Sequence, residues 1–174
     1  LTTLQNLKLI NSDGVTTTQH IPTLSEVLDL VHAKVPILIE LKTTGHSDIS
    51  LYGKTVLTAL EKYLKSYRDP KIYLQSFDPR IVHWIKKHHP KIPVGLLLSD
   101  DSDLAKKYDF FVNNPLIWRL VKPDFLSVNQ TMLTRPAIQK FKTHHPVLCY
   151  TIDDEKTLNE LKPLATQFII EKIL

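Results

Sequence analysis

Residues 72–85, IYLQSFDPRIVHWI, combine a short apolar strand with the start of a helix. The run Ile72–Phe77 is typical of a buried strand. Asp78 follows at the position expected for a helix N-cap, and Pro79 occupies the first helical position, where a missing N–H costs nothing. Apolar side chains at 81–85 then share one helical face. This stretch therefore predicts one strand-to-helix unit of an α/β fold.

The same alternation continues in both directions along the chain. Thr23 and Glu26 form a capping box that predicts a helix start before Leu24. Thr134 is expected to cap a later helix. Strands are expected at 36–42, 72–77, 94–98, 125–129, 147–152 and 168–173, with helices at 24–31, 51–67, from 79, within 104–121, at 134–142 and at 155–164. Regular alternation indicates right-handed βαβ units and a parallel sheet covered by helices.

Two architectures fit this order of elements. Six strands would complete an open, doubly wound sheet, and they would leave a (β/α)₈ barrel two strands short. The pattern alone leaves both open.

The composition of the chain excludes several classes of structure and function. Hydrophobic residues make up 43% of the 174 residues, which indicates one folded domain. The chain has 4 glycines and no glycine-rich phosphate loop, and its single Cys149 excludes an internal disulfide. A net charge of +4 favours anionic partners, but the cations are scattered and are not interleaved with aromatic residues, so no nucleic-acid partner is expected. No apolar run reaches the roughly 18 residues of a membrane span.

The strand at 36–42 carries the most informative polar residues. Side chains alternate along a strand, so Leu38, Glu40 and Lys42 share one face. A carboxylate and an ammonium at the end of a buried strand need partners. One interpretation is an ion pair between them that closes the barrel. The other is a hard-cation ligand, Glu40, beside a phosphate-binding cation, Lys42, at the strand end where α/β folds bind ligands.

Other strands end in polar or aromatic residues at the same level: Gln75–Phe77, Ser99, Asn129 and Tyr150–Thr151. Their convergence favours a site there. The adjacent pairs His88–His89 and His144–His145 are poor metal pairs, because neighbouring residues do not face the same way. His46 follows the Glu40 strand in a loop and could approach the site.

Four segments in this order resemble the glycerophosphodiester phosphodiesterases: Ile21–Leu28 (IPTLSEVL), Ile37–Lys42 (ILIELK), Gln75–Pro79 (QSFDP) and Val147–Asp153 (VLCYTID). The resemblance covers nearly the whole chain. It implies a (β/α)₈ barrel that hydrolyses glycerophosphodiesters to an alcohol and glycerol 3-phosphate with a divalent metal, Mg²⁺ or Ca²⁺.

The family's HRG, ExD and HD motifs, whose histidines act as general acid and base, do not occur in this sequence. The resemblance therefore implies a single partial domain over residues 1–174 that holds barrel strands three to eight and no catalytic histidine of the family. Carried over, Glu40 would be a metal ligand and Lys42 would bind the substrate phosphate. Tyr150 stands where the family often has Trp, and with Gln75 it would bind substrate. Phe168–Lys172 departs from the family's usual ending.

Four expectations follow. Because the chain starts at Leu1 and not at an initiator Met, we expect a fragment or processed form. Because the family's acid–base histidines and acidic metal ligands are missing, we expect this chain to be inactive alone. Ile37–Lys42 and Phe168–Ile173 should be bare sheet edges, open to pairing with another copy. A membrane domain in the parent protein is compatible with the resemblance, so localisation stays open. The alternative function is a non-catalytic, barrel-derived module that binds phosphate esters.

Overall fold

The computed structural model describes residues 2–68, 70–100 and 114–171. Its contacts divide the chain into two compact units. The first takes in residues up to Pro36 together with 55–71, and the second takes in 37–54 together with the residues from 72 onward. Helix α3 (Ile49–Ser66) crosses the division.

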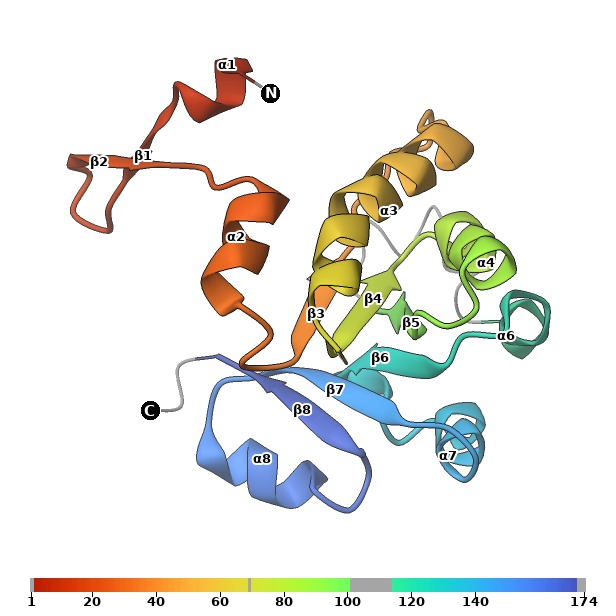
Figure 1. Ribbon diagram of the computed structural model, residues 1–174. Coiled ribbons are helices and arrows are strands. Elements are labelled where there is room, and N and C mark those ends of the chain that lie inside the picture. Colours follow the sequence, from red (N-terminus) through yellow and green to blue (C-terminus); the bar gives the residue numbers. More distant parts are fainter. Residues whose placement is uncertain (1, 69, 101–113, 172–174) are drawn as a thin grey trace. The chain divides into compact units, whose positions relative to one another are not determined.

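A six-stranded parallel sheet forms the second unit (Figure 1). Its strands are β3 (Ile37–Glu40), β4 (Ile72–Ser76), β5 (Val94–Leu98), β6 (Phe125–Asn129), β7 (Val147–Ile152) and β8 (Gln167–Ile170). They lie side by side in chain order, without the reversal of order that defines a doubly wound sheet. The doubly wound alternative is therefore wrong, and the incomplete (β/α)₈ barrel is confirmed.

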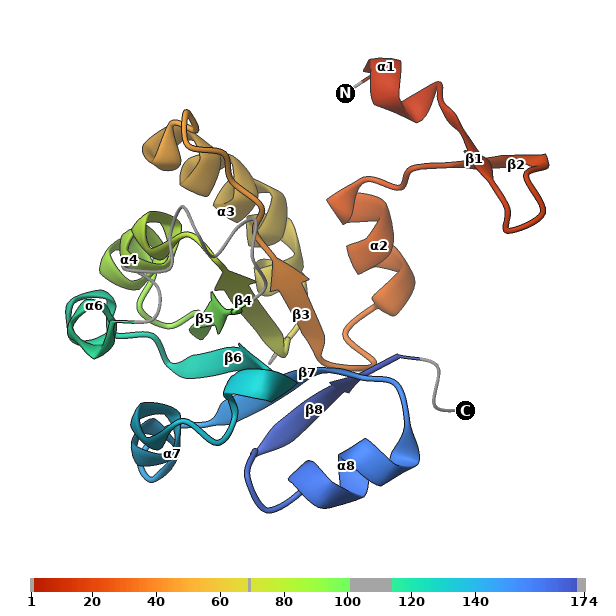
Figure 2. The same cartoon turned by 180° about the vertical axis from the view of Figure 1, so that it is seen from behind.

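The two edges of this sheet are the predicted ones. Within the described strands, β3 pairs only with β4, and β8 pairs only with β7. Figures 1 and 2 show the sheet curling between these edges. Strand β3 ends at Glu40, two residues earlier than predicted. Strand β8 begins one residue early and ends at Ile170.

One face of the sheet forms the hydrophobic core. The register pairs Leu96 of β5 with Leu126 of β6, and both side chains are completely buried. Helix α4 (Pro79–His88) contacts β4 and β5, while α7 (Pro136–Lys142) and α8 (Glu155–Leu161) contact β7. Helices cover this face of the parallel sheet and bury its strands. The strand sequences are therefore nearly continuous apolar runs.

The opposite, inner face carries larger and more polar side chains. Gly95 pairs with Phe125, and a Cβ at Gly95 would overlap the Phe125 ring. The same ring makes an edge contact with Tyr73, with 6.5 Å between centroids. The beginnings of the central strands are therefore closed by aromatic rings, and the polar positions lie toward the strand ends.

Two helices of this unit begin at a capping side chain followed by a proline. The Asp78 side chain accepts a hydrogen bond from the Arg80 N–H, with Pro79 at the first helical position, as predicted. Helix α6 (Pro115–Val121) begins in the same way after Asn114. The remainder of the helical region predicted at 104–121 lies mostly outside the described residues.

The prediction that Thr134 caps α7 is wrong. Arg135 is the N-cap residue, and its side chain makes no capping hydrogen bond. Pro136 fixes the first helical φ and has no N–H to satisfy, so the helix begins there without a polar cap. A short 3₁₀ turn, η1 (Gln130–Met132), comes between β6 and this helix.

The first unit begins with elements that the sequence did not predict. Helix α1 (Thr2–Gln5) precedes an antiparallel hairpin of β1 (Lys8–Ile10) and β2 (Thr16–His20). Gly14 turns the hairpin with a φ of 77°. Polar threonines dominate β2 and most of its residues are exposed, so the apolar pattern that reveals a buried strand is missing.

Helix α2 (Leu24–Val31) follows the hairpin, and its predicted capping box between Thr23 and Glu26 is confirmed. The helix ends with positive φ angles at His32 and Ala33. Within the same unit, Tyr63 of α3 fixes this turn, because its hydroxyl accepts the Ala33 N–H at 2.7 Å. No helix of the described residues is both long and apolar enough to cross a membrane.

Candidate functional site

Glu40 and Gln75 end neighbouring strands on the inner face of the sheet. The register pairs these two residues across β3 and β4. Glu40 is exposed, whereas Leu41, the next residue, is 3% exposed and faces the other way. The structure therefore brings together two of the four site residues predicted from the sequence.

Lys42 lies two residues after the end of β3 and is exposed. Among the described residues, no ion pair joins Lys42 to Glu40, so the interpretation of these two as a closing ion pair has no support in the observed contacts. The Tyr52 hydroxyl hydrogen-bonds to the Lys42 backbone; burial raises the pKa of Tyr52, and this bond partly offsets the rise.

The segment around Lys42 is fixed to the end of β4. Ser76 donates its hydroxyl to the Leu41 carbonyl at 2.6 Å, and Thr43 donates to an Asp78 carboxylate oxygen at 2.7 Å. Sequence reasoning identified Asp78 only as a helix cap. It joins the loop after β3 to the start of α4, and so it holds the backbone that carries Lys42.

Asp78 keeps its charge despite burial, since it is only 6% exposed. Burial raises its pKa, but the hydrogen bonds from Arg80 and Thr43 outweigh burial, and the pKa of Asp78 ends below its ordinary value. The Arg80 guanidinium also reaches the Thr44 carbonyl at 3.2 Å. A buried carboxylate with these donors is a positioning group, and its oxygens are already occupied.

In the part of the chain that the structure describes, two buried polar atoms on the inner face lack hydrogen-bond partners: Gln75 Oε1 and Ser127 Oγ. Gln75 is 6% exposed and Ser127 is fully buried. Native proteins rarely leave such atoms unsatisfied, so each needs a water or a ligand atom. Ser127 was not among the predicted site residues, although its sequence context, a serine inside an apolar strand, was an available signal.

Tyr150 lies at the end of β7, paired with Asn129 of β6. Its hydroxyl donates to the Leu98 carbonyl at 2.8 Å, and its ring meets Phe77 edge-on at 6.4 Å between centroids. These contacts hold the ring across the ends of the central strands. They place Tyr150 at the same end of the sheet as Glu40.

A further polar group lies between β5 and β6 and was missed by sequence reasoning. Asp100 accepts a hydrogen bond from the Thr131 hydroxyl at 2.5 Å and pairs with Arg135 at 3.3 Å. The Asn129 side chain accepts the Thr131 N–H instead of pointing a free amide oxygen into the site. This group ties together the loops that follow the two central strands.

Cys149 is not a candidate nucleophile. It is fully buried on the helix-covered face, and burial raises the pKa of its thiol to about 11. A thiol with that pKa is protonated and unreactive near neutrality.

Comparison with known proteins decides the family. The sequence model of the family described as "Glycerophosphoryl diester phosphodiesterase family" matches residues 1–170. The chain belongs to the glycerophosphoryl diester phosphodiesterase family. No curated protein matches it closely enough to be counted as a relative.

Solved structures agree on the fold of this phosphodiesterase-family chain. A Silicibacter pomeroyi DSS-3 protein named as a glycerophosphoryl diester phosphodiesterase superposes with a TM-score of 0.72 at 18% identity, and the match covers 90% of this chain and 55% of that one. An Oleispira antarctica phosphodiesterase, in complex with the product sn-glycerol-3-phosphate, gives 0.68 at 18% identity, with 88% and 58% covered. A Parabacteroides distasonis ATCC 8503 glycerophosphodiester phosphodiesterase gives 0.69 at 16% identity, with 97% and 65% covered. The chain thus spans 55% to 65% of the length of these three structures.

The residues present fit the family's divalent metal only in part. Glu40 offers an exposed carboxylate and Gln75 an unpartnered amide oxygen, both of which suit Mg²⁺ or Ca²⁺. Within the described residues, no group of three or more His, Cys, Asp and Glu side chains surrounds a common point. His46 lies in the loop after β3 and is exposed. The oxygens of Glu40 and Gln75 could complete the coordination shell of a metal ion, but they cannot form one without further ligands.

Proposed function

We propose that this chain is the phosphate-binding part of a phosphodiesterase that hydrolyses glycerophosphodiesters to an alcohol and glycerol 3-phosphate. The observation that carries the proposal is the pairing of Glu40 with Gln75 at the end of the inner face, in a chain whose family match spans residues 1–170. The Oleispira antarctica relative, bound to sn-glycerol-3-phosphate, supports the substrate class.

The proposed roles follow from the chemistry of each side chain. Lys42 offers a cation that would offset charge on the phosphate as the transition state forms. Glu40 would supply one carboxylate oxygen to Mg²⁺ or Ca²⁺, which when bound polarises phosphoryl oxygens. Gln75 Oε1 can only accept a hydrogen bond and has no partner among the described residues, so it suits a hydroxyl of the substrate rather than its phosphate. Tyr150 would pack against the glycerol part.

Proton transfer is not assigned to these residues. Among the described residues at the strand ends of the parallel sheet, no histidine is hydrogen-bonded to a carboxylate, and the HRG and HD motifs do not occur in the sequence. Proton transfer by a positioned side chain typically contributes about 10²–10⁴-fold. We therefore propose that the 174-residue chain binds product but turns over no substrate.

Titration calorimetry with sn-glycerol-3-phosphate tests the binding part of this proposal. Lys42→Ala should weaken binding about tenfold, because it removes one close cation from the phosphate. Lys91→Ala is the matched control, because Lys91 is an exposed cation that precedes β5 at the opposite end of the sheet. Equal affinities of the two variants would refute the role of Lys42.

Added Mg²⁺ or Ca²⁺ tests the role of Glu40. The metal should strengthen glycerol 3-phosphate binding by the wild-type chain and have less effect on Glu40→Gln, which keeps the shape but not the charge.

An assay with glycerophosphocholine and either metal should show no turnover. Turnover that Glu40→Ala abolishes would show that the chemistry lies within this chain.

A non-catalytic module that binds phosphate esters is the alternative. The buried, unpartnered Gln75 Oε1 and Ser127 Oγ suit a binding site as well as an active one. Hydrolysis of glycerophosphocholine by the natural protein would decide for the enzyme. Pairing of the β3 and β8 edges between two copies, and a membrane domain in the parent protein, stay predictions.

A further inference from the structure

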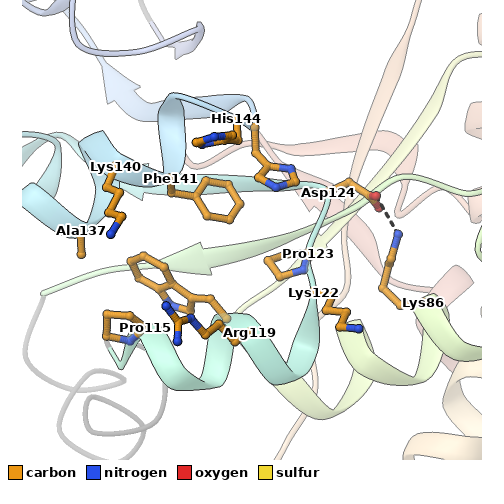
Figure 3. Close-up of a pocket in the computed structure, with 12 residues that line it drawn as sticks. Lys86, Pro115, Arg119, Lys122, Pro123, Asp124, Ala137, Lys140, Phe141 and His144 are labelled. Atoms are coloured by element: carbon orange, nitrogen blue, oxygen red, sulfur yellow. Dashed lines mark hydrogen bonds and ion pairs between the residues drawn. The ribbon is translucent and has the colours of Figure 1, made fainter.

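A groove of about 830 Å³ lies between helices α6 and α7, at the end of the sheet where the strands begin (Figure 3). Phe141 and Lys140 reach toward it from α7, and Arg119 and Pro115 from α6. Pro123 and Asp124, which precede β6, also line the groove. Glu40 and Tyr150 lie at the opposite ends of their strands, so this groove is separate from the candidate site.

The groove is strongly cationic. Lys86, Arg119, Lys122 and Lys140 line it, with Asp124 as the only carboxylate among its described lining residues. Lys86 pairs with Asp124 at 2.7 Å, which cancels one charge of each sign. Among the described residues, no ion pair joins Arg119, Lys122 or Lys140 to a carboxylate.

Helix dipoles explain part of this arrangement. Arg119 and Lys140 lie in the last turns of α6 and α7, where cations offset the negative helix ends. That effect requires only that each cation lie near its own helix end. It does not require Arg119, Lys122 and Lys140 to line one groove together, and none of the three has an ion-pair partner among the described residues.

The walls of the groove are apolar. Trp118, 7% exposed, meets Phe141 edge-on at 6.0 Å between centroids. Phe141 in turn stacks on His145 at 4.7 Å. Pro115 and Ala137 add apolar surface on the two sides. The groove therefore combines apolar walls with a positively charged rim.

We propose that this groove binds a small organic phosphate, with the phosphate between Arg119 and Lys140 and an apolar or aromatic group against Phe141. A volume of about 830 Å³ lies within the usual range for small-molecule sites. Arginine presents paired N–H donors that match phosphate oxygens, and a bound dianion would offset the positive charge of the side chains that line the groove. The neighbouring aromatic walls favour a ligand with an apolar part over inorganic phosphate.

Titration of the 174-residue chain with 1-naphthyl phosphate tests the proposal, with inorganic phosphate and 1-naphthol as the two halves of the probe. We expect 1-naphthyl phosphate to bind more tightly than either half, and affinity to fall as salt is added. The double variant Arg119→Ala/Lys140→Ala should lose about tenfold or more in affinity. Lys54→Ala/Lys156→Ala, which also removes two exposed cations but none from the groove, should bind like wild type.

Three further measurements keep the result interpretable. Circular dichroism must show that both double variants are folded; if the alanine variant is not, Lys140→Gln, which is exposed and conservative, replaces it. Lys42→Ala should keep the part of naphthyl phosphate binding that Arg119→Ala/Lys140→Ala removes, which separates this groove from the site of the proposed function. Vesicles of phosphatidylcholine with and without phosphatidylserine show whether the cations attract a membrane instead.

The outcomes are distinct. Binding that the groove variant loses and the other variants keep supports the proposal. Equal loss in both double variants would indicate nonspecific attraction to surface charge and would overturn it. An absence of binding, or binding to anionic vesicles without binding to naphthyl phosphate, would also overturn it. Loss on Lys42→Ala alone would assign the phosphate to the candidate site and refute a second one.

Discussion

Replacement of Asp78 by alanine should destabilise the chain and loosen the loop that carries Lys42. The carboxylate caps α4 through the Arg80 N–H at 2.9 Å and accepts the Thr43 hydroxyl at 2.7 Å. Loss of an N-cap costs about 1 kcal/mol, and loss of a hydrogen bond to a charged group about 1.5 kcal/mol. The pair with the half-exposed Arg80 adds about 0.5 kcal/mol. The expected loss is therefore about 3 kcal/mol, or about 6–12 °C in Tm for a chain of this size.

Asp78→Asn is the matched variant, because an amide oxygen can still cap α4 while the charge is lost. It should lose about half as much stability as Asp78→Ala. Thermal unfolding followed by circular dichroism measures both. The reasoning fails if the two variants lose the same stability, or if Asp78→Ala loses less than about 1 kcal/mol.

The pH dependence provides a second check on Asp78. Its pKa is lowered in the folded chain, so its stabilisation is fully present above the pKa of the unfolded chain, about 3.9, and disappears as pH falls through the lower folded value. Wild type should therefore lose stability below about pH 4, and Asp78→Asn should lack this part of the decline. Identical acid profiles would show that the charge on Asp78 contributes nothing.

Two further predictions concern the buried faces of the sheet. Gly95→Ala should lower the free energy of unfolding by about 1–3 kcal/mol, because the new methyl group meets the Phe125 ring. The same substitution should cost less in a Phe125→Leu background, and an equal cost in both backgrounds would exclude this overlap as the cause. Cys149 should react with iodoacetamide at pH 8 about two orders of magnitude more slowly in the folded chain than in urea, because burial raises the pKa of its thiol to about 11. Similar rates in the two conditions would contradict the burial of Cys149.

The strands of the sheet were predictable because they are buried under helices. Leu96, Leu98 and Val128 are completely buried, and runs of such residues mark a strand whatever its neighbours are. The strand order needed more than this pattern. Six alternating strands fit both an open sheet and a partial barrel, and only the pairing of each strand with the next one in the chain excluded the first.

The elements that the sequence failed to predict correctly are ones whose structure burial does not decide. Strand β2 is largely exposed and polar, so the hairpin at the start of the chain leaves no apolar pattern. Thr134 is a residue type that favours N-caps, but Pro136 two positions later sets the helix start by its own fixed geometry. Local propensity failed in both cases because a different local constraint decided the structure.

The candidate site was predictable only for residues within one strand. The alternation of Leu38, Glu40 and Lys42 can be read along the chain, since residues two apart share a face. The contacts that hold the site join residues that follow different strands: Thr43 and Asp78 are 35 residues apart, and Asp100 and Arg135 are also 35 apart.

That separation is set by the fold. Neighbouring parallel strands are one strand-to-helix unit apart in sequence, so loops that touch at the strand ends come from positions about one unit apart. The same rule covers Ser76 with Leu41, and Asp100 with Thr131, at 35 and 31 residues. Once a sequence predicts βα units, complementary polar residues one unit apart at strand ends are therefore the places to look for loop-fixing hydrogen bonds. Thr43 with Asp78 and Asp100 with Arg135 are two such pairs in this chain.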